Sequence, residues 1–186
     1  MLIPSGKSVI TLSLLTALLF CALFRPNTTA ASVQLNESQA KAVFVFNIIR
    51  YVTWPKEVYN SENTIEVGIL SKTVNDSSWD ILKNRTIQGK RLIIRKSSDI
   101  DDLRSCQIIY IDTTVRKDLV RFLNAIKLEP ILTISDIDNF HTREGGMITL
   151  NIVNNKLNFT VNLATARKSS LDISSHLLKL AHEVLR

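Results

Sequence analysis

The chain has few of the residues that stabilise or equip many small domains. Its 186 residues include two cysteines, five glycines and four prolines. Cys106 is the only cysteine beyond the N-terminal apolar segment, so an internal disulfide is excluded for most of the chain. There is no repeat and no Pro/Gly linker, and neither glycine-rich phosphate-binding motif, G-x-x-x-x-G-K-[ST] or G-x-G-x-x-G, occurs. We therefore expect one domain with a self-sufficient apolar core, in which Cys106 is buried.

Motifs for catalysis and metal binding are also missing. The G-x-S-x-G motif of serine hydrolases is absent, and His141, His176 and His182 have no obvious serine and aspartate companions for a catalytic triad. His176 and His182 are six residues apart, which places them on different faces of a helix. We therefore predict no enzyme activity, no metal site and no cofactor.

The formal net charge is +6, but its distribution does not indicate a nucleic-acid partner. Aromatic residues that could stack on bases are not interleaved with the basic residues of the central segment. The basic residues concerned are Lys83, Arg85, Lys90, Arg91, Arg95 and Lys96. We expect a solvated basic face and no nucleic acid.

The N-terminus has the pattern of a secretory signal peptide. Lys7 precedes an apolar run over residues 9–24, and the small residues TTAA follow at 28–31. The run is shorter than the ~20 residues that cross a bilayer comfortably. We predict a signal peptide over 1–30, a tail over 31–38 and one domain over 39–186. After export and cleavage, we expect the mature protein not to be inserted directly in the membrane.

The segment KAVFVFNIIRYVTWP predicts an unusually apolar helix. Asn36 and Gln39 can cap it, and Pro55 limits it at about Val52. Apolar residues cover nearly its whole circumference, so we expect one side to pack on a sheet and the rest to meet a second subunit or helix. Complete burial within one monomer is the alternative. The residues assigned to this dimer or core helix are Phe44, Asn47, Ile48, Tyr51 and Trp54.

Short apolar segments alternate with helical patterns through the middle of the chain. This alternation predicts a mostly parallel sheet of about six strands, with helices on both faces. Residues 148–161 alternate apolar and polar side chains around Asn154-Asn155, which predicts an antiparallel edge hairpin. The predicted strands are 64–70, 90–96, 107–111 and one starting at 130; the predicted helices are 77–84, 114–127, 164–168 and one from 174.

Polar residues follow three of the predicted strands. Ser71, Asp112 and Asp136 would gather at the carboxyl ends of a parallel sheet, where such folds bind ligands. They form a candidate ligand crevice. The alternative is that the aspartates cap the helices that follow them.

Four segments in order carry a resemblance to a known family. They are KAVFVFNIIRYVTWP, GIL, RSCQIIYI and ILTISDIDNFHTREGGMITLNIVNNKLNFTVNLATARKSSLDISSHLLKLAHEVL. Together they resemble the YfiR family of exported bacterial regulators from about Gln39 to Leu185. The most specific parts are Asn47 with Trp54-Pro55, residues 132–148, and Asn162 with Ala166-Arg167 and Leu171.

The resemblance implies a dimeric, non-enzymatic periplasmic regulator. Such a protein binds the periplasmic sensor domain of an inner-membrane diguanylate cyclase, or a related sensor, and represses it, which lowers cyclic di-GMP and biofilm formation. Better-known members contain cysteine pairs; this chain has only Cys106, so control by an internal disulfide does not carry over. We assign partner contact to Arg167, Leu171 and Ile173, expecting the two apolar residues to be exposed beside the arginine. The alternatives are a periplasmic small-molecule receptor that feeds a membrane signalling protein, and a hydrolase.

Overall fold

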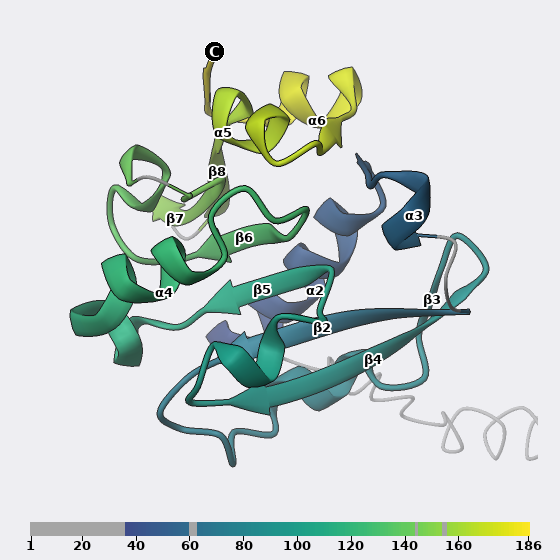
Figure 1. The fold of residues 1–186 in the computed structure, drawn as a ribbon. Coiled ribbons are helices and arrows are strands. Elements are labelled where there is room, and N and C mark those ends of the chain that lie inside the picture. The colour runs from purple at the N-terminus through teal and green to yellow at the C-terminus, as the bar shows by residue number, and fades with distance from the viewer. Residues whose placement is uncertain (1–35, 60–62, 144, 154–155) are drawn as a thin grey trace, which may run out of the picture. The chain divides into compact units, whose positions relative to one another are not determined.

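The fold is built on one eight-stranded mixed sheet (Figure 1). The computed structural model describes residues 36–59, 63–143, 145–153 and 156–186, and residues 35–186 form one compact unit. The strand order across the sheet is β10 (Glu183–Leu185), β8 (Lys156–Asn162), β7 (Ile148–Val153), β6 (Leu132–Ser135), β5 (Ile108–Ile111), β2 (Thr64–Leu70), β4 (Lys90–Ser97) and β3 (Thr86–Ile87).

The five strands from β7 to β4 are parallel to their neighbours, and β7 and β8 form the predicted antiparallel hairpin. Every residue of β5 and β6 is buried, as is typical of central strands in a parallel sheet that is covered on both faces. The predicted α/β class with a mostly parallel sheet is confirmed, and the sheet has more strands than the six expected. The predicted turn at Asn154-Asn155 lies outside the described residues.

The apolar helix is α2 (Glu37–Ile49), and it begins as predicted. Asn36 and Gln39 form a reciprocal capping box, in which Asn36 Oδ1 accepts from the Gln39 backbone N–H at 2.8 Å. The helix ends before the predicted Val52. The next residues instead form β1 (Val52–Thr53), which pairs with β9 (Asp172–Ile173), so a partner distant in sequence takes over the backbone hydrogen bonds. A short helix, α3 (Lys56–Tyr59), follows.

Helices cover both faces of the sheet, as predicted. One apolar cluster joins the sheet to α2, η1 (Ser78–Leu82), α5 (Leu163–Lys168) and α6 (Ser175–Leu180). A second cluster joins the opposite face to η2 (Asp101–Leu103), η3 (Thr113–Asp118), α4 (Leu119–Ala125) and η4 (Phe140–Thr142). Within the described ranges, no helix has the length and apolar character needed to cross a membrane. The predicted signal peptide lies outside those ranges.

Two predicted helices are shorter or more divided than expected. The segment 114–127 is split between the 3-10 helix η3 and the α-helix α4. The helix predicted from residue 174 ends at Leu180, and Val184 belongs to strand β10 instead. β10 forms because Val184 pairs with Val161 of β8 in parallel register, a tertiary contact that helical periodicity does not report.

Candidate functional site

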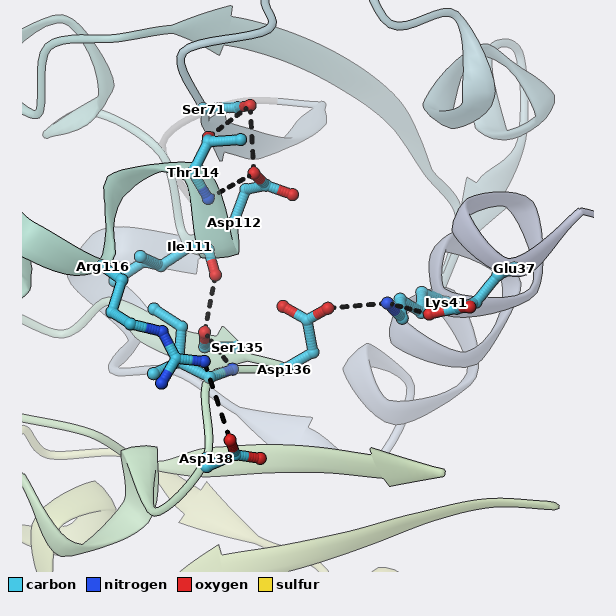
Figure 2. A network of polar contacts seen from close by, with 11 residues as sticks. Glu37, Lys41, Ser71, Ile111, Asp112, Thr114, Arg116, Ser135, Asp136 and Asp138 are labelled. Carbon is cyan, nitrogen blue, oxygen red and sulfur yellow. Dashed lines mark hydrogen bonds and ion pairs between the residues drawn. The ribbon is translucent and has the colours of Figure 1, made fainter. Parts of the chain in front are cut away.

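The carboxyl ends of three neighbouring strands lie at one edge of the sheet. Leu70, Ile111 and Ser135 are aligned by the registers of β2, β5 and β6. The residues that directly follow these strands are therefore Ser71, Asp112 and Asp136, the three members of the predicted crevice. Figure 2 shows that they divide into two separate polar groups.

Ser71 and Asp112 belong to the first group, which stabilises loops. Ser71 Oγ donates to Asp112 Oδ1 at 3.4 Å and lies 3.2 Å from Thr114 Oγ1 and 2.9 Å from Thr73 Oγ1. Asp112 Oδ1 also accepts from the Thr114 backbone N–H at 2.8 Å and so caps η3. The capping alternative is therefore confirmed for Asp112.

Asp136 belongs to the second group and points toward α2 (Figure 2). Its Oδ2 accepts from Lys41 Nζ at 2.6 Å, and the same ammonium lies 2.6 Å from Glu37 one turn earlier in the helix. The side chains of Lys41 and Asp136 are only 13% and 14% exposed. An ammonium between two carboxylates thus ties α2 to the end of β6.

The environment of Lys41 holds it in its charged form. Burial by itself would lower the pKa of Lys41, but hydrogen bonds and charge interactions with Asp136 and Glu37 outweigh it, so the pKa is raised. Sequence reasoning missed this pair, whose members are 95 residues apart. The available signal was a single lysine within an otherwise apolar helical segment.

Tyr110 lies within reach of the same charge. Its side chain is 2% exposed, and both burial and the negative charge of Asp136 raise its pKa. The phenol also lies close to Trp79, with ring centroids 4.6 Å apart. Tyr110 therefore remains a neutral, packed residue across the physiological pH range.

A groove runs along α2, and we call it the α2 groove. Its polar part has a volume of about 420 Å³ and is lined by charged and amide side chains that include Glu37, Lys41, Asp136, Asp138 and Asn151. Its apolar part has a volume of about 300 Å³ and is lined mainly by Phe44, Ile48, Tyr51, Phe159, Leu177 and Leu180. Leu157 and Asn158 line both parts, so the two are adjacent.

The residues assigned to a dimer or core helix divide between the core and this groove. Ile48 and Trp54 are core residues, 2% and 4% exposed, and Trp54 Nε1 donates to the carbonyl of Gln107 at 3.2 Å. Phe44 and Tyr51 are half-buried, and Asn47 is exposed. The described part of the chain therefore covers one side of α2 only partly, with Phe44 packed on Phe159 and Tyr51 on His176. Contact of this side with a second subunit stays a prediction.

The expected exposed patch around Arg167 is only partly present. Arg167 is exposed on α5, but Leu171 and Ile173 are 2% and 3% exposed, so the expectation that they are exposed is wrong. Ile173 pairs with Val52 in the β1–β9 ladder, and Leu171 packs in the same core as α2. The two apolar residues anchor the segment after α5 in the core. A role of Arg167 in partner contact stays a prediction.

The cysteine Cys106 is a core residue on the opposite face of the sheet. It is 1% exposed, in agreement with the prediction of burial, and it has no disulfide partner among the residues that the structure describes. Burial, together with the charge of Glu66, raises the pKa of its thiol to about 12. At neutral pH the group is therefore an uncharged apolar side chain.

Comparison with known proteins identifies the family. The model of the YfiR/HmsC-like family matches residues 38–182, nearly the whole of the described domain, and the chain belongs to this family. A search of curated proteins finds no match. The family is regulatory, which agrees with the resemblance found in the sequence.

Proposed function

We propose that this protein is a periplasmic regulator that acts by binding and represses an inner-membrane diguanylate cyclase. The observation that carries the proposal is the family match over residues 38–182. Repression would follow if the protein binds the inactive conformation of the sensor domain more tightly than the active one. Its release would then allow the cyclase to become active and raise cyclic di-GMP. In this proposal the regulator is a homodimer.

The chemistry at the strand ends supports binding rather than catalysis. The hydroxyl of Ser71 is engaged by Thr73, Thr114 and Asp112, and Asp112 caps a helix. Asp136 is neutralised by Lys41. These contacts hold neighbouring elements together. The carboxylate beside the serine hydroxyl, that of Asp112, accepts from it at 3.4 Å through the same oxygen that caps η3.

Arg167 is the residue that we propose for contact with the cyclase. Its side chain is exposed on α5, and the buried Leu171 and Ile173 anchor the segment that follows this helix in the core. An exposed guanidinium on a rigid element can bind a carboxylate of a partner in a defined geometry. Lys168, the next residue, is also exposed and basic, and so provides a matched control.

The test is crosslinking capture from bacterial envelopes with the tagged protein. Wild type, Arg167→Glu and Lys168→Glu are compared, captured proteins are identified by mass spectrometry, and cellular cyclic di-GMP is measured. We expect wild type and Lys168→Glu to capture a diguanylate cyclase and to lower cyclic di-GMP, and Arg167→Glu to do neither. If wild type captures no cyclase and leaves cyclic di-GMP unchanged, the proposal is wrong.

A periplasmic small-molecule receptor is the second candidate, and the α2 groove favours it. Its two parts, about 420 and 300 Å³, lie in the usual size range of ligand sites, and Asp136 lines the polar part. Native mass spectrometry of protein isolated from envelopes tests this candidate. A small molecule retained by wild type and lost on Phe44→Ala would support it, and a spectrum of ligand-free protein would count against it.

A further inference from the structure

The outward side of α2 is unusually apolar for a helix at a protein surface. Ala40, Val43, Phe44 and Phe46 are all only partly buried. Among the residues after Lys41, only Asn47 and the C-cap residue Arg50 are polar. A surface helix normally presents polar residues on this side, so the exposed side of α2 has the composition of a covered one.

The border of the α2 groove shows what kind of cover fits. The large apolar residues that the described chain leaves most exposed are Val74, Val120, Leu128, Ile152 and Leu180. Two of them, Ile152 at 48% and Leu180 at 61% exposure, line the groove. A small molecule inside the groove would leave these border residues in water, whereas a protein surface would cover them.

The two ends of the groove carry opposite charge. At the N-terminal end of α2, the carboxylates of Glu37 and Asp136 share the one ammonium of Lys41, which leaves a net negative charge. Asp138 lines the same part of the groove, and its carboxylate lies 3.7 Å from Arg116 of η3. At the other end lies Arg50, and Tyr51 beside it stacks on His176 of α6 with ring centroids 5.2 Å apart. With a rise of 1.5 Å per residue, Glu37 and Arg50 are about 20 Å apart along the helix.

We infer that the occupant of the α2 groove is a second copy of this chain, packed with its α2 antiparallel to the first. This surface is complementary to itself: a twofold axis near Val43 brings the acidic end of each copy opposite Arg50 of the other. Isologous interfaces require such self-complementarity. In the same register, the small Ala40 of one copy lies opposite Asn47 of the other, which allows close approach. The inference rests on the homodimer of the proposed function and names its interface.

Cysteine crosslinking tests the axis directly. Val43→Cys is introduced into the full-length protein, which is recovered from envelopes, oxidised mildly and digested for mass spectrometry. We expect a disulfide between the two copies of position 43, in a large excess over the control Val120→Cys. Val120 is 61% exposed on α4, on the opposite face of the sheet. Cys106 is buried in both variants and should not form crosslinks. Equal crosslinking of the two variants overturns the inference.

Charge reversal tests the orientation. Arg50→Glu and Asp138→Lys each set like charges against one another at two symmetric places, so we expect each to weaken dimerisation about tenfold in sedimentation equilibrium. The double variant exchanges the charges and should recover most of the loss. Asp138 is chosen because its side chain is 82% exposed, its own pair with Arg116 is a solvent-exposed one, and the Lys41 pair stays intact. Additive weakening in the double variant contradicts antiparallel packing.

The outcomes separate this inference from the proposed function. If position 43 does not link and the wild type is monomeric, while capture of a cyclase still depends on Arg167, the interface is wrong and the regulatory function stands. If the disulfide forms but no cyclase is captured, the interface stands and the function fails. Crosslinking of position 43 to the cyclase itself would also overturn the inference, because the groove would then hold a different partner.

Discussion

The two faces of the sheet differ in how completely they are sealed. On the α4 face, the core contains Phe122, Phe140 and Cys106, each at most 2% exposed. On the α2 face, a core of similar kind adjoins a half-buried ion pair and the α2 groove. The buried core of the α4 face therefore contributes to stability, whereas the α2 face combines a core with an open groove that can bind. Substitutions should separate these two roles.

The largest effect is expected on the sealed face. Phe122→Ala removes a ring that is 2% exposed, and the cavity left behind should lower the free energy of unfolding by about 3 to 5 kcal/mol. Urea denaturation followed by circular dichroism measures the loss. The exposed Val120→Ala on the same helix is the control, with an expected change of less than about 0.5 kcal/mol. A loss below about 1 kcal/mol for Phe122→Ala would show that this face is not tightly packed.

A smaller effect is expected at the ion pair of the open face. Asp136→Asn leaves the half-buried Lys41 ammonium with Glu37 alone, and we expect a loss of about 2 to 3 kcal/mol because removal of one partner strands a desolvated charge. Asp101→Asn, at an exposed pair with Arg104, should cost less than about 0.5 kcal/mol. Equal costs for the two variants would show that the Lys41 pair is no stronger than a surface pair.

The same pair should give the protein a dependence on alkaline pH. Since folding raises the pKa of Lys41, the pair's contribution is complete below the ordinary lysine pKa of 10.5 and is lost as the pH rises through the higher folded value. The urea midpoint should therefore fall more between pH 9 and pH 11 for wild type than for Asp136→Asn. Parallel behaviour of the two proteins would contradict this assignment.

The smallest effect on stability is expected at Cys106. Cys106→Ala removes one buried sulfur atom and should cost about 1 kcal/mol. A sharper readout is alkylation by iodoacetamide at pH 8. With a thiol pKa of about 12, Cys106 should be nearly unreactive in the native protein and react readily in urea. Rapid native labelling would show that the sealed face opens.

Much of the fold could be predicted because local patterns and burial agree. The strand 64–70 was predicted with the bounds that β2 has, and the Asn36–Gln39 capping box was predicted from residue types alone. The hairpin of β7 and β8 followed from alternating side chains. Cys106 was predicted to be buried because unpaired cysteine is among the most buried residue types. In each case the deciding interactions are local, or depend only on whether a side chain avoids water.

The candidate site was predicted less well, because its contacts join distant segments. Ser71, Asp112 and Asp136 were correctly placed at the strand ends, since parallel strands align their carboxyl ends. The sequence could not reveal that Asp136 binds Lys41. Nor could it show that Leu171 and Ile173 are buried, because that burial depends on the pairing of β9 with β1.

The sequence by itself determined the α/β class, the start of α2, the principal strands and the family. Tertiary structure decided where α2 ends, that residues 183–185 form a strand, and which charges are paired. The physical reason is the range of the interactions involved. Capping and periodicity act within a few residues, whereas the partner of Val52 lies in β9, that of Val184 in β8 and that of Lys41 after β6.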